Sequence, residues 1–215
     1  GKSGLNLVNS PALVDGLTYS GTAYGVRTDA DLTIKNSSLT SSGNANDLSD
    51  PDTALVLRHD TVKTITIENS LLQNSVAGNY AISNTTGSPA GKITLVVTGL
   101  DTGGGSFDEK LLGGFTNIWL VDTVGSTETI TFYTTIQSAI DAATGGETVL
   151  VFPGTFEEGP VDGARSKVGL YITKPNLTIQ STDGAAVTII DVQGTGLVNG
   201  VEVDDGLGTV TFDGF

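Results

Sequence analysis

Two stretches of this chain repeat one pattern and decide its fold. Residues 32–39 read LTIKNSSL, and residues 65–72 read ITIENSLL. The second stretch begins 33 residues after the first, and related triplets recur at residues 93–95 (ITL), 177–179 (LTI) and 210–212 (VTF). Neighbouring side chains of a strand point to opposite faces, so each triplet turns two apolar side chains inward and one threonine outward. A strand-containing repeat of this length is typical of a β-solenoid, in which each coil stacks on the next.

Stacking predicts what the inside of such a solenoid contains. Coils lie ~4.8 Å apart and align like side chains, so internal aliphatic columns are expected. Asn36 and Asn69 fall at the same point of the repeat, directly after the strand. We expect their amides to hydrogen-bond to one another and to the turn backbone, as an asparagine ladder inside the corner.

Composition and charge limit the classes of function. The 29 glycines among 215 residues suit frequent turns between short strands. No cysteine is present, which excludes disulfides and thiolate chemistry. The formal net charge of −14 repels phosphate groups, so we do not expect nucleic acid as a partner. The longest apolar runs are short strands such as residues 148–152, so membrane insertion is not expected either.

One segment has the periodicity of a helix. Its apolar positions i, i+3, i+4 and i+7 are Ile136, Ala139, Ile140 and Ala143. The sequence predicts one amphipathic helix near residues 135–144. Thr134 is expected as its N-cap, with Gln137 completing a capping box.

The segment that starts at this helix resembles a known family. Residues 136–143 (IQSAIDAA), 146–151 (GETVLV) and 153–158 (PGTFEE) are similar to the opening of pectin-lyase-like β-helices, and residues 174–179 (KPNLTI) are similar to the next coil. The resemblance implies a right-handed parallel β-helix whose first coil is plugged by the helix. It says little about activity, because the family includes lyases, hydrolases, epimerases, adhesins and phage tailspikes.

The order of the segments is unexpected for that family, because the helix lies in the middle of the chain. Residues 1–100 read as later coils, residues 101–130 as a glycine-rich linker and lead-in strand, and residues 131–215 as the capping helix and first coils. We expect residues 131–215 to stack on residues 1–100 of the same or a neighbouring copy, since an open coil exposes unpaired backbone and apolar columns. A tandem array, a circular permutant and a head-to-tail filament all satisfy this expectation.

Acidic residues supply the candidate metal site. Asp47, Asp50 and Asp52 lie in one short stretch (DLSDPDT), and closely spaced carboxylates suit calcium. A solvated turn around Pro51 is an equally natural interpretation. We predict no other cofactor.

No catalytic residues are predicted. His59 is the single histidine and has Asp60 beside it, but no nucleophile accompanies the pair. Asp204 and Asp205 are adjacent, so a turn explains them better than a pair of carboxylates facing one sugar. Trp119 is expected in the core. The Asn-Thr-Asp, Gly-His-Gly and Arg-Ile-Lys motifs that polygalacturonases of the resembling family carry do not occur.

These observations favour a structural function. We expect a non-enzymatic β-helix module of a secreted or cell-surface protein that acts as a spacer, adhesin segment or filament subunit. Its partner would be a further copy of itself, by end-to-end stacking of coils, and a polysaccharide partner stays open. The alternative is a polysaccharide-binding or polysaccharide-degrading β-helix, with lyase, hydrolase or epimerase activity.

Overall fold

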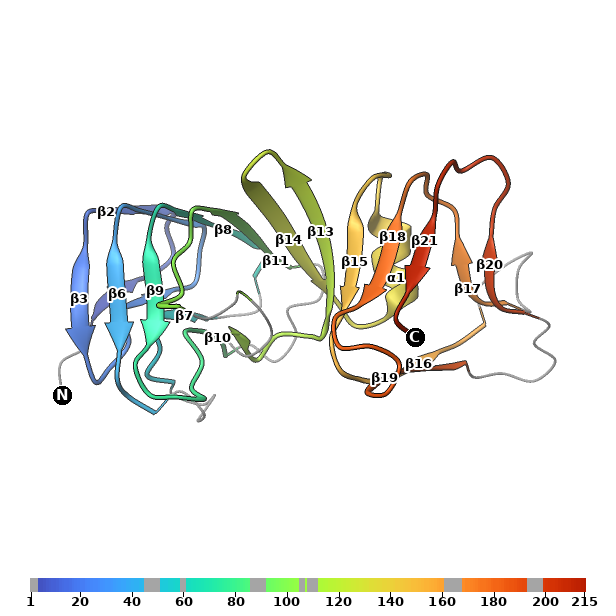
Figure 1. The fold of residues 1–215 in the computed structure, drawn as a ribbon. Helices are drawn as coiled ribbons and strands as arrows, with labels where there is room; N and C mark the ends of the chain where they lie inside the picture. The colour runs from blue at the N-terminus through green and yellow to red at the C-terminus, as the bar shows by residue number, and fades with distance from the viewer. Residues whose placement is uncertain are drawn as a thin grey trace. The chain divides into compact units, whose positions relative to one another are not determined.

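The predicted repeat appears as parallel strands that pair with one another in chain order. The computed structural model describes residues 4–44, 51–58, 61–85, 92–104, 107, 112–160, 168–192 and 199–215. The chain divides into two units (Figure 1). The first unit is Gly1–Phe115 with Val124–Thr131, and the second is Thr116–Thr123 with Phe132–Phe215.

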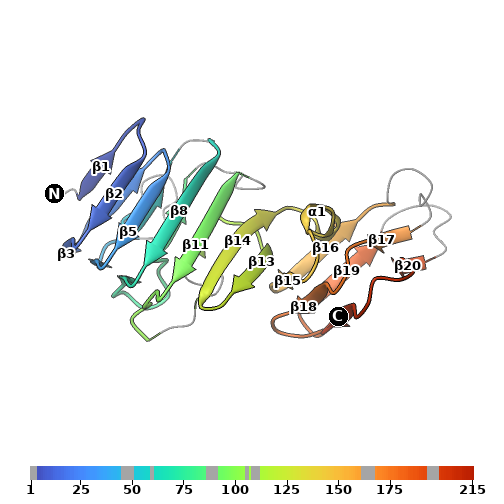
Figure 2. The same ribbon diagram turned by 90° about the horizontal axis from the view of Figure 1, so that it is seen from above.

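Stacked coils build the first unit, and their strands form three parallel rows (Figures 1 and 2). Row A contains β1 (Leu5–Leu7), β4 (Val26–Thr28), β7 (Leu55–Leu57), β10 (Ile82–Asn84) and β12 (Leu112–Gly113). Row B contains β2 (Ala12–Asp15), β5 (Leu32–Lys35), β8 (Lys63–Glu68) and β11 (Ile93–Thr98). Row C contains β3 (Thr18–Gly21), β6 (Ser38–Ser41) and β9 (Leu71–Asn74). The predicted parallel β-helix is therefore confirmed for this unit.

The register of these strands forms the predicted aliphatic columns. In row B, Leu32 pairs with Ile65 and Ile34 with Ile67, and all four side chains are buried. One column of row A consists of Leu5, Val26, Leu55, Ile82 and Leu112. Burying an aliphatic side chain of this size stabilises a fold by roughly 1.5–3 kcal/mol. The columns therefore hold successive coils together.

The predicted asparagine ladder is wrong. Asn36 and Asn69 have left-handed backbones, with φ of 47° and 46°, and both are exposed. Gly16 and Gly99 take the same place in neighbouring coils, with φ of 70° and 61°. Asparagine tolerates this conformation better than most residues, and here it turns the amide outward. The Asn36 Nδ2 donates to Asp15 Oδ1 at 3.0 Å.

Serines form the ladder instead. Ser37 and Ser70 follow the two asparagines and are buried. The Ser37 Oγ donates to the Lys35 carbonyl at 2.6 Å and accepts from the Leu17 N–H at 3.1 Å. The Ser70 Oγ in turn accepts from the Ser37 N–H at 3.1 Å. The serine hydroxyls therefore link three successive coils. In each Asn-Ser pair the asparagine forms the left-handed turn and the serine forms the ladder.

The second unit also contains stacked parallel strands, in three shorter rows. The first row is β15 (Thr148–Val151), β18 (Thr178–Ser181) and β21 (Thr211–Asp213). The others are β16 (Gly154–Glu158) with β19 (Thr188–Val192), and β17 (Val168–Ile172) with β20 (Asn199–Val203). Val149, Ile179 and Phe212 form one inward column of the first row.

The single helix of the described residues, α1 (Ile136–Ala142), begins one residue later than predicted. Its N-cap is Thr135 rather than Thr134, and the capping box is completed by Ser138 rather than Gln137. The Gln137 side chain is engaged elsewhere. Its Nε2 donates to the Tyr171 carbonyl at 3.0 Å, and its Oε1 accepts from the Tyr171 N–H at 2.8 Å. This pair of hydrogen bonds fastens α1 to β17.

The predicted apolar face of α1 is confirmed. Ile136, Ala139 and Ile140 are fully buried, and the face packs against β15, β16 and β17. These three strands are the first coil of the second unit, so the helix covers the end of its apolar columns. No helix in the described part of the chain combines the length and hydropathy that a membrane crossing requires.

Two further strands lie where a linker and lead-in strand were predicted. β13 (Ile118–Val124) pairs with β15 in the second unit, and β14 (Thr127–Tyr133) pairs with β11 in the first. Both pairings are antiparallel, unlike those between coils. Each strand therefore covers an edge that a parallel row would otherwise leave unpaired.

Candidate functional site

The predicted calcium ligands fall mostly outside the described residues. Asp47 and Asp50 are outside them, and only Asp52 is described. The Asp52 N–H donates to the Asn44 carbonyl at 3.0 Å, and the Asp52 carbonyl accepts from the Ser41 Oγ at 2.6 Å. Within the described ranges, no group of three or more metal-ligating side chains is placed to hold an ion. Calcium binding therefore stays a prediction.

The histidine pair is outside the described residues as well, and the other candidates occupy structural positions. His59 and Asp60 are not described. Asp204 and Asp205 lie in an exposed turn after β20, where the Asp204 N–H donates to the Ile172 carbonyl at 2.9 Å. This is the turn expected from the sequence, and nothing in it brings two carboxylates to face a common ligand.

Trp119 is a core residue, as predicted. Its side chain is buried and its Nε1 donates to the Thr116 carbonyl at 2.9 Å. The indole lies 5.6 Å from the Phe132 ring in an edge-on arrangement and 4.3 Å from the Phe152 ring. A tryptophan enclosed in this way offers no platform for a sugar.

A buried glutamate that the sequence did not single out anchors the N-terminus of α1. Glu158 lies on β16 with its side chain buried. Its carboxylate accepts from the Ile136 N–H at 2.5 Å and from the Gln137 N–H at 3.3 Å. Burial raises the pKa of the Glu158 carboxyl, and the two hydrogen bonds only partly offset this rise. The carboxylate therefore fixes the helix to its coil, but it loses contact with water because it is buried.

Replacing Glu158 should remove a pH dependence of stability. Because the folded pKa of this carboxyl lies above the ordinary 4.5, its contribution to stability is complete below that pH. It is lost as the pH rises through the folded pKa. The melting temperature of Glu158→Gln minus that of the parent should therefore increase as the pH is raised from mildly acidic to neutral. Thermal melts across this range test it, and a melting difference that does not change with pH would contradict the assigned pKa shift.

A second glutamate has the opposite shift. The Glu147 carboxylate accepts from the Thr144 N–H at 2.8 Å, the Thr144 Oγ1 at 2.5 Å and the Gly145 N–H at 2.6 Å. Burial acts to raise the pKa of this carboxyl, but the hydrogen bonds outweigh it and the pKa lies below its ordinary value. Glu147 closes the loop after α1. Its role is structural.

The open end of the second unit is the most distinctive surface. Ile190, Val192, Val201 and Val203 lie on the last strands of their rows, and Phe212 lies on β21. Val201 and Val203 pair with Leu170 and Ile172, which are fully buried, so their side chains face inward. They are nevertheless 37% and 46% exposed, and Phe212 is 39% exposed. No further coil among the described residues covers them.

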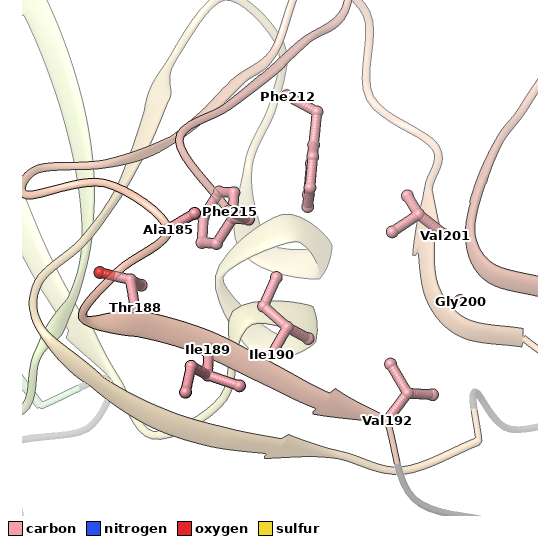
Figure 3. Close-up of a pocket in the computed structure, with 9 residues that line it drawn as sticks. All are labelled: Ala185, Thr188, Ile189, Ile190, Val192, Gly200, Val201, Phe212 and Phe215. Atoms are coloured by element: carbon pink, nitrogen blue, oxygen red, sulfur yellow. The ribbon is translucent and has the colours of Figure 1, made fainter.

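These side chains border a hollow of about 310 Å³ (Figure 3). Phe212 and Phe215 line one side of it, with ring centroids 4.7 Å apart, and Ile190 and Val201 lie across from them. The residues that line this hollow include no charged side chain. It can therefore receive apolar side chains, but its lining residues offer no acidic or basic group that could act on a substrate.

The first unit has a free end of its own. β1 and β2 are the first strands of their rows. Leu5 stands at the head of an inward column and is 41% exposed. Among the described residues, each unit therefore has one end whose apolar columns have no neighbouring coil.

A second hollow, of about 570 Å³, lies on the first unit and is polar. Its walls include the exposed Asn36 and Asn69, the hydroxyls of Thr18 and Ser38, and the carboxylate of Asp101. Asp101 is its one acidic residue, and no aromatic side chain lines it. Neither hollow combines aromatics with convergent acids, the arrangement that would favour a polysaccharide-degrading site.

Comparison with known proteins identifies no relative of this chain. No protein family model matches the chain, and no curated protein and no solved structure matches it.

Proposed function

We propose that the chain is a structural β-solenoid module of a secreted or cell-surface protein, related in design to the pectin-lyase-like β-helices. It would act as a spacer, adhesin segment or filament subunit by stacking coils end to end. The observation that carries this proposal is the open end of the second unit, where inward-facing apolar side chains are exposed.

The open end favours a protein partner with the same coil geometry. Exposed apolar side chains arranged in columns lose water most completely against a matching coil. The outer edge of β21 also has backbone groups that a parallel strand can pair with. A second copy offers both features at the free end of its first unit, where Leu5 heads a column. Repetition of such a contact gives a rod.

Two other features support a structural module. The helix α1 packs on the first coil of the second unit, as the family resemblance implies. The hollows described above provide no set of groups for general acid–base chemistry. The cysteine-free, acidic composition is compatible with a location outside the cell.

Self-association of the chain tests the proposal. We expect its sedimentation coefficient to rise with protein concentration. Phe212→Lys places a charge in the exposed apolar column, so it should weaken association by at least about tenfold. Thr211→Lys is the matched control, because this neighbour on β21 faces outward and the variant carries the same added charge.

Control measurements separate assembly from folding. Circular dichroism and thermal melting should show that both lysine variants stay folded, since both positions are exposed. A parent chain that remains monomeric at all concentrations would refute the proposal. Equal association of the two variants would show that the contact does not use the open end.

A further inference from the structure

The last strand of the chain and the first strand of row B share one pattern. Residues 210–215 read VTFDGF, and residues 12–17 read ALVDGL. In both segments an Asp ends the strand and a glycine with a left-handed backbone follows, with φ of 80° at Gly214 and 70° at Gly16. The two segments are therefore equivalent parts of a coil.

The left-handed residue marks the register of stacked coils. In the first unit Asp15 pairs with Lys35, and Lys35 with Glu68. The residue after each of these three has a positive φ. Coils of the first unit therefore stack with their left-handed corners aligned. A coil that continues the stack beyond β21 should align its own corner with Gly214.

We propose that β2 of a second copy pairs in parallel with the free edge of β21, with Asp15 beside Asp213 and Gly16 beside Gly214. This inference rests on the proposed function and specifies which residues lie side by side at the end-to-end contact. The inward column of Ile179 and Phe212 then continues into Val14 of the second copy. In each coil the row A type of strand comes directly before the row B type, as β1 comes before β2 and β20 before β21. Val201 and Val203 of one copy therefore meet β1 of the second copy, which begins with Leu5. The contact is heterologous, so it propagates.

The proposed register has an electrostatic consequence. Within the first unit the same outward column continues from Asp15 to Lys35 and Glu68, and the Lys35 Nζ lies 2.8 Å from Glu68 Oε2. At the junction Asp213 would instead adjoin another aspartate. Like charges directly opposite each other on neighbouring strands are unfavourable. The junction should therefore be weak at neutral pH and become tighter when either carboxylate is replaced.

Charge exchange tests the register. Asp213→Lys and Asp15→Lys should each tighten self-association roughly three- to tenfold, because each converts repulsion into attraction. The double variant places two lysines at the junction and should return to about the affinity of the parent. Asp122→Lys is the control for net charge, since this exposed residue of β13 has no part in the contact.

Sedimentation of these variants distinguishes the register from the proposed function. If both single variants associate no better than Asp122→Lys while Phe212→Lys still dissociates the assembly, the register is wrong and end-to-end stacking stands. A double variant as tight as the better single variant would also refute the register. If neither the parent nor any variant associates, the proposed function fails together with the register.

Discussion

Ile140→Asp should lower the free energy of unfolding of the second unit by roughly 3–5 kcal/mol. Ile140 is fully buried on α1 among Val149, Leu170 and Ile179. An aspartate there loses the apolar contacts and buries a carboxylate without a partner. Chemical denaturation followed by circular dichroism measures the change.

Ala142→Asp is the matched control for this variant. Ala142 lies on the same short helix but is exposed, so the same chemical group should cost less than about 1 kcal/mol. If Ile140→Asp unfolds within about 1 kcal/mol of the parent, α1 does not serve as the cover of the first coil.

Trp119→Ala should destabilise the second unit by about 3–5 kcal/mol. The indole is buried between Phe132 and Phe152 and donates to the Thr116 carbonyl. Removing it leaves a large cavity and an unsatisfied carbonyl oxygen. Trp119→Phe should cost less, because it keeps a ring between the two phenylalanines and loses only the hydrogen bond and part of the contact area.

Denaturant titration measures both variants, and Val124→Ala on the same strand is the control. Val124 is 72% exposed, so its truncation should have little effect on stability. Equal stability of Trp119→Ala and the control would mean that the aromatic cluster does not contribute to the core.

The periodic features of the fold could be predicted from the sequence because they are local. Strand alternation placed Leu32 and Ile34 inside and Thr33 outside, and the repeat aligned them with Ile65 and Ile67. Helical spacing likewise identified the buried face of α1. In both cases the side-chain period alone determines which residues face the core.

Features that depend on a distant partner could not be predicted in this way. Gln137 was expected in the capping box because its position fits, but the backbone of Tyr171 binds it instead. The asparagines were expected inside because their amides suit a ladder, but the left-handed backbone points them outward. Alternation in TETITFY, residues 127–133, was a usable signal for β14.

The candidate site depended even more on three-dimensional information. Glu158 lies 22 residues from Ile136, whose N–H it binds, so no local pattern connects the two. The last strand of the open end was anticipated, because VTF at residues 210–212 repeats the triplet pattern. Which side chains surround the hollow could be known only from the register of β19, β20 and β21.

The pairing of each coil with the next also determines how the first unit would respond to force. Backbone hydrogen bonds between stacked strands run along the direction in which coils accumulate, so tension in that direction pulls on these bonds directly. A coil at the end of the stack contacts one neighbour and can detach before the others. The 33 residues between Ile34 and Ile67 occupy ~4.8 Å of the stack when folded, but span roughly 110 Å when pulled straight. A tether built of such coils would lengthen in steps under load and keep its remaining coils intact.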